Sequence, residues 1–396
     1  MKEFSGAFFL LAWMIFHPPG KISLFTGKPP FSSGIYQKKY SGIGWDSSTL
    51  VRISPPNSSG SYPRMIQLKN GLLLTAYASR GNIVIAKSSD EGRTWSLPKT
   101  IAAMRDAVNM DTPELLQLQN GNLLLCYATR PQAALRGHPD TAQKFEIRVQ
   151  ESRDGGDSWQ NEKILYKAGA SFNDGCWEPA AVQIPSGEIQ VFFANEAIYT
   201  VSNEQNISML RSADNGATWS AEPQIISFRK NSRDGMPVPL WLKKEKKIIV
   251  AIEDPGDKNF KPFILQSAQN GQWKKLIDGD DTNRWKALKR PLADTVYAGA
   301  PYLRQLPTGE TILSYQSTED RVKNRDHNAV MRVAVGDEQA KDFDDITTPF
   351  IIPEGYGALW SSLCLLKGAS VIAVTSTNGY SKGRSEIWMI RGALKR

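Results

Sequence analysis

An internal repeat is the feature that most constrains how this 396-residue chain can fold. An eight-residue motif occurs three times, as SSDEGRTW from Ser88, SRDGGDSW from Ser152 and SADNGATW from Ser212. The segment SAQNGQW from Ser267 resembles a decayed fourth copy. Copies about 60 residues apart indicate an array of repeated structural units rather than unrelated domains.

The chemistry of this motif predicts a local turn. Ser and Asp side chains bond nearby backbone groups in turns, and Gly supplies the positive φ that a tight turn needs. The terminal Trp can then pack its large ring against the adjoining strands. We therefore expect Trp95, Trp159 and Trp219 to be buried, and we expect the motif's aspartates to serve the turn rather than catalysis.

A second, longer repeat counts the units. A strand-like run, a tight polar turn and another strand-like run recur as RMIQLKNGLLLTAY, ELLQLQNGNLLLCY, AAVQIPSGEIQVFF, PLWLKKEKKIIVAI, YLRQLPTGETILSY and SSLCLLKGASVIAV. Asn-Gly, Ser-Gly and Thr-Gly at the centre are hairpin signals. Six such units predict an all-β fold, a six-bladed β-propeller of four-stranded antiparallel blades over residues 45–396.

The short motif also carries a resemblance. Its form S-x-D-x-G-x-T-W is the Asp box, or BNR repeat, and six units with such turns resemble the sialidase superfamily. The segment YPRMIQLKNGLLLTAY from Tyr62 looks like the first-blade segment of that superfamily, in which an Arg opens the strand. The resemblance covers residues 45–396 and implies a propeller with Asp-box turns. It does not fix the function, because many non-enzymatic propellers carry Asp boxes.

The start of the chain suggests export. Residues 7–16, AFFLLAWMIF, follow Met1 and Lys2 as an apolar run of signal-peptide length that is too short to span a bilayer. We expect residues 1–25 to be a signal-like or N-terminal segment. The protein is then expected to be secreted or periplasmic, with no stable membrane insertion.

Charge and composition narrow the partners. The net charge is +8, but Lys and Arg are scattered, without a basic block interleaved with aromatics, so no nucleic-acid partner is expected. An anionic substrate stays open. The three Cys and three His are too far apart to indicate a disulfide framework or a metal site, so no cofactor and no metal are expected. The resemblance to the sialidase superfamily implies a glycan substrate, and we expect a monomer.

The repeat assigns the two faces of the propeller. In each unit the Gly turn joins the inner two strands, and the Asp-box turn joins the outer two strands at the same end. The opposite face therefore receives the start of each repeat and the end of its second strand. The resemblance implies that substrate binds at this opposite face, so the catalytic residues are expected at these junctions.

Two carboxylates stand at such junctions. Glu178 lies in Trp177-Glu178-Pro179 at the start of the third unit, and Glu253 follows the apolar run IIVAI in the fourth. Glycoside hydrolysis needs two carboxyl groups, one as acid and one as nucleophile or base, so both are predicted to be catalytic. Desolvation by Trp177 favours Glu178 as the acid and Glu253 as the nucleophile, although the reverse assignment stays open.

A second resemblance supports this pair. The exo-α-1,5-arabinanases are six-bladed relatives of sialidases that use a two-Glu retaining mechanism. Trp177-Glu178-Pro179 looks like the segment that carries their first catalytic Glu, and Glu253 lies about where the second would be. The resemblance implies an exo-acting retaining glycoside hydrolase.

Two other functions stay open, an exo-α-sialidase and a non-catalytic carbohydrate-binding propeller. Sialidases clamp the substrate carboxylate with three arginines, for which a guanidinium fork is suited, and Arg64 resembles the first of them. The resemblance is incomplete, because Trp360 stands where the sialidase Tyr nucleophile would fall and Tyr356 lies four residues earlier. The acid/base Asp expected after the first unit is also not evident, since Arg80 is followed only by Gly-Asn before the next strand.

The remaining junctions supply the residues expected to bind substrate. They are rich in charged and aromatic side chains, and Arg304, inside the fifth repeat, is a weaker candidate for the arginine clamp. The predicted substrate-binding residues are Arg64, Arg80, Asp111, Arg130, Trp177, Asp254, Tyr356 and Trp360.

Overall fold

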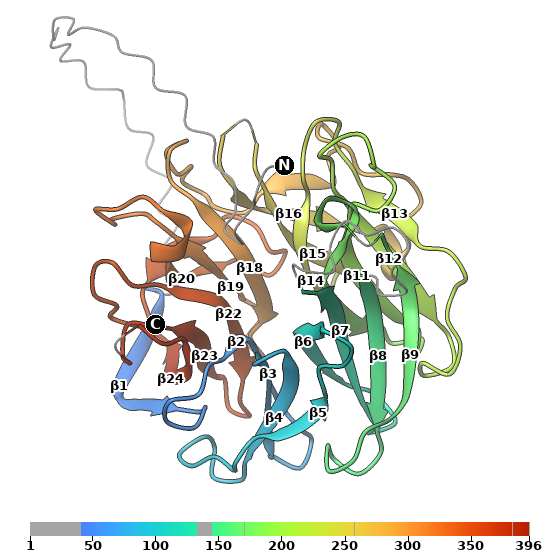
Figure 1. Cartoon of the computed structure of the whole chain (residues 1–396). Coiled ribbons are helices and arrows are strands. Elements are labelled where there is room, and N and C mark those ends of the chain that lie inside the picture. Colours follow the sequence, from blue (N-terminus) through green and yellow to red (C-terminus); the bar gives the residue numbers. More distant parts are fainter. Residues whose placement is uncertain (1–40, 133–144, 170, 257, 382, 396) are drawn as a thin grey trace, which may run out of the picture. The chain divides into compact units, whose positions relative to one another are not determined.

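The computed structural model is built almost entirely of strands (Figure 1). It describes residues 41–132, 145–169, 171–256, 258–381 and 383–395. Over these ranges the chain forms six four-stranded sheets with antiparallel neighbours, together with three one-turn 3₁₀ helices. The all-β, six-bladed propeller predicted from the repeats is confirmed.

Five of the sheets are continuous in the sequence, with the innermost strand first. Their strands are β2 (Ser61–Gln67), β3 (Leu73–Ser79), β4 (Asn82–Ser88) and β5 (Lys99–Ala102) in blade 1; β6 (Val108–Gln117), β7 (Leu123–Pro131), β8 (Glu146–Ser152) and β9 (Gln160–Lys167) in blade 2; β10 (Cys176–Gln183), β11 (Ile189–Asn195), β12 (Asn206–Ser212) and β13 (Gln224–Ser227) in blade 3; β14 (Gly235–Leu242), β15 (Lys247–Asp254), β16 (Lys261–Gln266) and β17 (Arg284–Lys286) in blade 4; and β18 (Ala298–Gln305), β19 (Thr311–Ser317), β20 (Val330–Gly336) and β21 (Asp344–Thr347) in blade 5. The 3₁₀ helices span Phe172–Asp174, Gln269–Gly271 and Asp326–Asn328.

Blade 6 closes the ring with strands from both ends of the described chain. It consists of β22 (Ala358–Leu365), β23 (Ser370–Thr377), β24 (Glu386–Leu394) and, outermost, β1 (Ile43–Arg52). β1 pairs antiparallel with β24, with Ile43 opposite Leu394, and the blue strand lies beside the red one in Figure 1. The first and last strands are therefore locked together, and the innermost strand β22 packs against β2 of blade 1.

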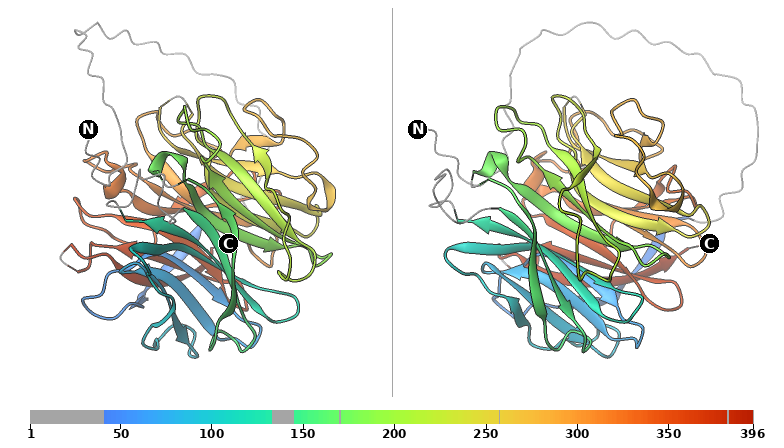
Figure 2. Two further views of the ribbon diagram at one scale, coloured as in Figure 1. Left: turned by 45° about the vertical axis from the view of Figure 1, so that its right-hand side comes forward. Right: turned by 90° about the vertical axis from the view of Figure 1, so that its right-hand side faces the viewer.

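The core lies between neighbouring blades, whose sheets are drawn from two further directions in Figure 2. One buried cluster joins blades 4 to 6 and includes Val238, Tyr302 and Leu363. Another joins blades 2 to 4 and includes Phe192 and Ile252. Because each blade buries both faces of its sheet against its neighbours, the strands read as apolar runs and the blades are held in a fixed order.

The Asp boxes form the turns that the sequence predicts. In the first copy the Ser88 hydroxyl donates to Asp90 and accepts from the amide of Gly92 at 2.8 Å. Asp90 also accepts from the backbone and hydroxyl of Thr94. The Thr94 hydrogen bonds hold the pKa of Asp90 well below its usual value, so this carboxylate is kept ionised by its turn.

The tryptophans of the three clear copies are half-buried, so the prediction that they are buried is wrong in degree. Trp95 and Trp219 each donate through Nε1 to a carbonyl of their own turn, at 3.1 Å, and this keeps the ring at the rim of the core. Trp273, in the decayed fourth copy, is the one of the set that is buried, at 5% exposure, and it donates to Gln190 in blade 3.

The two faces are also arranged as the repeats predict. The hairpin between β2 and β3 and the Asp box between β4 and β5 lie at one end of blade 1, and β2 begins at the other end, where Ser61 pairs with Ala78. We call the end at which the innermost strands begin the strand-start face.

The signal-like segment at residues 1–25 lies outside the described residues. Within the ranges that the structure describes, no helix has the length and apolar character needed to cross a membrane.

Candidate active site

Each innermost strand carries one non-glycine residue with positive φ near its start. The six residues are Tyr62, Thr112, Glu178, Met236, Ala300 and Trp360, with φ between 48° and 50°. In every blade the register between the innermost and second strands shifts at this position. We call these six residues the bulge ring, since a one-residue shift in register is a β-bulge.

The bulge ring directs side chains toward the centre of the strand-start face. Tyr62 stacks on Trp360 with ring centroids 4.7 Å apart, and Tyr62 and Met236 share an apolar cluster. Thr112, Glu178 and Met236 line one small cavity. A non-glycine residue at positive φ costs about 1–3 kcal/mol and persists only where the surroundings impose it. Six such positions facing one point identify it as a candidate active site.

Glu178, in blade 3, is the ring member with an acidic side chain. Burial raises the pKa of Glu178 to about 8, and the negative charge of Glu253 is the second cause. Arg130 opposes the shift, whereas Asp111 adds to it. A carboxyl group with this pKa carries its proton at neutral pH, as a general acid must.

Glu253, in blade 4, lies at the end of β15 and is 8% exposed. Its Oε2 accepts a 2.8 Å hydrogen bond from the backbone amide of Ala300 in blade 5. A Cβ atom on Gly299 would lie 2.6 Å from Oε2, and one on Gly235 would lie 3.1 Å from Oε1. Burial raises the pKa of Glu253 to about 7, against the Ala300 hydrogen bond and the charge of Arg233. The absence of a side chain at Gly299 and Gly235 therefore provides the space that the Glu253 carboxyl group occupies.

An ion pair lies beside Glu178. Arg130 and Asp111 approach to 3.2 Å, and the Arg130 guanidinium lies over the Trp177 ring, 5.0 Å from its centroid. Trp177 is buried and donates through Nε1 to Glu196 at 2.7 Å, and Glu196 is paired with Arg233. Arg130, Asp111 and Trp177, all predicted from the sequence, are thus brought together next to the two glutamates.

Tyr297 was not predicted from the sequence. Its hydroxyl accepts a 2.7 Å hydrogen bond from Gln316, and a Cβ on Gly299 would lie 2.6 Å from that hydroxyl. Burial and then the charge of Glu253 raise the pKa of Tyr297 well above its usual value, so the phenol stays protonated beside the carboxylate. It precedes β18 and belongs to neither repeat, so no sequence signal pointed to it.

Tyr62 was also missed, although a signal was present. Tyr62-Pro63 occupies the same position in the first repeat as Glu178-Pro179 in the third. Burial and the charge of Glu178 raise the pKa of Tyr62 well above its usual value. Its stacking partner Trp360 was predicted to bind substrate, so the two rings form an aromatic wall of the site.

Arg64 lies among the innermost strands and is 6% exposed. Its Nε lies 3.2 Å from Glu114, and its Nη1 donates to the carbonyl of Trp360 at 2.9 Å. Arg304, the weaker clamp candidate, lies 3.8 Å from the same Glu114. Both arginines therefore have a protein carboxylate as their partner.

The other predicted binding residues lie elsewhere. Asp254 is 1% exposed and pairs with Arg284 of blade 4 and with Arg229, which lies between blades 3 and 4. Arg80 is exposed on the turn between β3 and β4. Tyr356 is half-buried and packs against the core of blades 4 to 6. Binding roles for these residues stay predictions, as do the catalytic roles of the two glutamates.

Among the residues that the structure describes, no group of three or more His, Cys, Asp or Glu side chains is arranged to hold a metal ion.

Comparisons with known proteins agree with this architecture. Residues 132–319 match the family model of the BNR repeat-like domain, and no curated protein matches the chain. A solved α-L-arabinofuranosidase of Fusarium graminearum is 16% identical, with a TM-score of 0.65 over 87% of this chain and 97% of that chain. The α-L-arabinanase of Penicillium chrysogenum is 17% identical, with a TM-score of 0.64 over 86% and 97%. The NanB sialidase of Streptococcus pneumoniae is 13% identical, with a TM-score of 0.57 over 90% and 70%.

These similarities extend along nearly the whole propeller, and they include both groups of glycosidase that the sequence resembles. With its Asp boxes, its six four-stranded blades and its match to the BNR repeat-like domain over residues 132–319, the chain is a six-bladed propeller whose fold is similar to that of solved arabinanases and sialidases.

Proposed function

We propose that this protein is an exo-acting retaining glycosidase that uses Glu178 as acid/base and Glu253 as nucleophile on a glycan. The observation that carries the proposal is the pair itself. A half-buried carboxyl group, Glu178, and a buried one, Glu253, from neighbouring blades interact electrostatically at the bulge ring, and their pKa values are raised to about 8 and about 7. Paired carboxyl groups with separated pKa values are the mark of a glycosidase acid and nucleophile.

The causes of the two pKa shifts support the assignment of roles. The Ala300 hydrogen bond and the charge of Arg233 favour the ionised form of Glu253, and the charge of Glu253 helps Glu178 to keep its proton. Around neutral pH the pair therefore holds one carboxylate and one carboxylic acid, as the first step of a retaining reaction requires.

The reaction then proceeds in two displacements. In the first, a carboxylate oxygen of Glu253 bonds to the anomeric carbon, the glycosidic C–O bond breaks, and the Glu178 proton moves to the departing oxygen. In the second, water attacks the same carbon, its proton passes to Glu178, and the bond to Glu253 breaks. Both carboxyl groups return to their starting protonation states.

The hydrogen bonding of Glu253 supports Oε1 as the attacking atom. Oε2 is held by the amide of Ala300, whereas Oε1 accepts no hydrogen bond from the described residues and faces Gly235. A fixed carboxylate with one oxygen free meets the positioning requirement of nucleophilic attack.

The structural neighbours suggest the first substrates to test. Two of them are named as an α-L-arabinofuranosidase and as an α-L-arabinanase complexed with arabinobiose, so α-L-arabinofuranosyl linkages are the proposed targets. Purified protein would be assayed on aryl-α-L-arabinofuranosides, arabino-oligosaccharides and sialyllactose, with NMR of the first-formed anomer. Release of the retained anomer from one end supports the proposal, whereas an inverted product contradicts it.

The two alternative functions have less support. A sialidase needs arginines free to clamp a carboxylate, but Arg64 and Arg304 both lie against Glu114. A purely carbohydrate-binding propeller gives no reason for two interacting carboxyl groups to lie in a site that desolvates both of them, which is energetically unfavourable.

We also propose that the protein is exported, on the basis of the apolar run at residues 7–16. Expression of the full chain followed by N-terminal sequencing of protein from the medium or periplasm tests this. Recovery of the intact chain in the cytoplasm alone would contradict it.

A further inference from the structure

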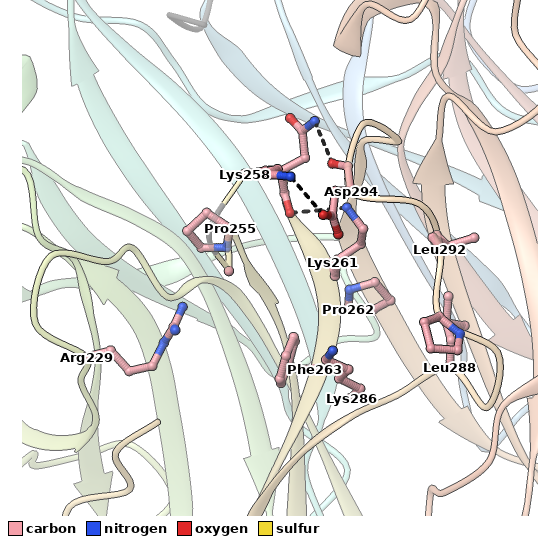
Figure 3. Close-up of a pocket in the computed structure, with 13 residues that line it drawn as sticks. Arg229, Pro255, Lys258, Lys261, Pro262, Phe263, Lys286, Leu288, Leu292 and Asp294 are labelled. Carbon is pink, nitrogen blue, oxygen red and sulfur yellow. Dashed lines mark hydrogen bonds and ion pairs between the residues drawn. The ribbon is translucent and has the colours of Figure 1, made fainter. Parts of the chain in front are cut away.

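A second cavity opens on blade 4, beside the strand-start face (Figure 3). It is lined mainly by β16, β17 and the segment that follows each of β15 and β17. Its wall begins at Pro255, two residues after Glu253, which places the two Cα atoms within about 7 Å of each other. A ligand that extends outward from Glu253 across blade 4 would therefore meet this cavity.

The cavity wall contains four cationic side chains, Arg229, Lys258, Lys261 and Lys286. The arginine is neutralised within the protein, because it pairs with Asp254 in a buried network that also holds Arg284 and Asp234. Two arginines and two aspartates balance in that network. The surplus charge of the cavity comes from its lysines.

A single carboxylate, Asp294, faces the three lysines. It pairs with Lys258 at 3.0 Å, as the dashed line in Figure 3 shows. Lys261 Nζ donates to the neutral carbonyl of Val296 at 2.6 Å, whereas Lys286 forms no ion-pair contact among the described residues and acts on Asp294 through its charge. Burial lowers the pKa of Lys261, the charge of Asp294 opposes this shift, and the charge of Lys286 adds to it more weakly. Because one carboxylate faces three lysines, an anion bound between Lys261 and Lys286 would balance the remaining positive charge.

The same cavity has an apolar side. Phe263, Pro262, Leu288 and Leu292 line it together with the lysines, and Figure 3 shows Phe263 between Arg229 and Lys286. A small inorganic anion would gain no favourable contact from these apolar side chains. A pyranose or furanose ring can lay its C–H face on apolar side chains while its charged substituent reaches the ammonium groups.

We propose that this cavity is a binding subsite for a sugar residue that carries a carboxylate or sulfate group, recognised by Lys261 and Lys286 and supported by Phe263. The inference rests on the proposed function, since it assigns the cavity to the same glycan that reaches Glu253. It adds a substrate class, anionic glycans, and places their recognition in blade 4 rather than at the arginines of the innermost strands.

Binding of defined oligosaccharides to the full-length protein tests the subsite directly. Isothermal titration calorimetry would compare tetragalacturonate, a sulfated tetrasaccharide and a neutral tetrasaccharide with wild type, Lys286→Glu, Lys286→Gln and Lys261→Met. Lys274→Glu is the matched control. Lys274 is exposed in the same blade but lies outside this cavity, and its substitution changes the net charge by the same amount. The two charged ligands show which anionic group the subsite prefers.

We expect wild type to bind an anionic tetrasaccharide more tightly than the neutral one. Lys286→Glu should weaken that binding by at least about tenfold, since a favourable charge pair becomes a repulsive one. Lys286→Gln should have a smaller effect in the same direction, and Lys274→Glu should leave the Kd within about twofold of wild type. Equal affinity for charged and neutral ligands overturns the proposal, and so does an equal loss in Lys286→Glu and Lys274→Glu, which would mean attraction by overall charge.

A second assay separates this inference from the proposed function. A small neutral aryl-glycoside is too short to reach the cavity, and its turnover depends on the two glutamates. The lysine variants should therefore retain wild-type kcat/KM on this substrate. If no neutral glycoside is turned over but anionic ligands bind in a Lys286-dependent way, the subsite stands and the proposed reaction fails. If turnover occurs and anionic ligands show no Lys286-dependent binding, the subsite fails alone.

Discussion

The backbone amide of Ala300 donates a 2.8 Å hydrogen bond to Oε2 of Glu253, which joins a bulge-ring residue of blade 5 to the carboxylate of blade 4. The bulge exists because Ala300 adopts a φ of 48°, and the register of β18 shifts at this point. The unfavourable backbone conformation thus has a local consequence, since it presents an amide to the proposed nucleophile.

The space around this hydrogen bond gives the first prediction. In Gly299→Ala the new Cβ would lie 2.6 Å from both Glu253 Oε2 and the Tyr297 hydroxyl, so the carboxylate must move. A displacement of about 1 Å at a reacting group should lower kcat by about tenfold to a hundredfold. Steady-state kinetics with a thermal melt would test this. In the control Gly44→Ala the three atoms nearest to the new Cβ all belong to the flexible Lys395 side chain, and wild-type kinetics are expected.

The roles of the two glutamates give the second prediction. Glu253→Gln should abolish turnover of every substrate, because the covalent bond cannot form. Glu178→Gln should lose about 10²–10⁴-fold on natural linkages but retain activity on aryl-glycosides with good leaving groups, which need little protonation. Azide should restore turnover to Glu253→Ala by replacing the nucleophile. The reversed pattern would keep the mechanism and exchange the roles, while wild-type rates in both variants would refute it.

Much of this site follows from the repeats, and the limits of that reasoning have physical causes. The repeats predict the blades, the strand-start face and the positions of Glu178 and Glu253, because each unit buries the same apolar pattern. The bulge ring was not predicted. A residue before proline is expected to be extended. Five of the six ring residues precede a proline and nevertheless adopt positive φ, so the sequence argued against the observed conformation.

The ion-pair partners of Arg64 and Asp254 were also not predicted from the sequence. Arg64 resembles a sialidase arginine in its sequence position, but its carboxylate partner, Glu114, lies in the next blade. Asp254 follows Glu253 directly, yet alternation along β15 sends it to Arg229 and Arg284. Contacts between blades depend on side chains distant in sequence, and no local pattern reveals them.

The raised pKa values predict how stability depends on pH. The usual value of a Glu carboxyl is 4.5, and folding raises it to about 8 for Glu178 and about 7 for Glu253, so the folded state binds more protons between these limits. The stabilisation that comes from proton binding by these two groups is present at low pH and is lost above pH 8. The free energy of unfolding should therefore fall as pH rises from about 5 to 8. Glu178→Gln should lose part of this dependence, so its Tm should exceed that of wild type more at pH 8.5 than at pH 5. Parallel Tm curves for the two proteins would contradict the raised pKa of Glu178.

Substitution of Arg64 tests whether this arginine stabilises the fold or clamps the substrate carboxylate. Arg64 and Glu114 are both buried, so Arg64→Met leaves a carboxylate short of its nearest cation and should reduce the free energy of unfolding by about 3–5 kcal/mol. Glu114→Gln in the same chain should restore part of the loss, because the buried charge is then removed. Denaturant unfolding of the single and double variants measures both effects. The retained Arg304 lies 3.8 Å from Glu114 and would moderate the loss, so values near the lower limit are expected. A carboxylate clamp predicts a different result, in which unfolding is unchanged and KM rises for acidic sugars alone.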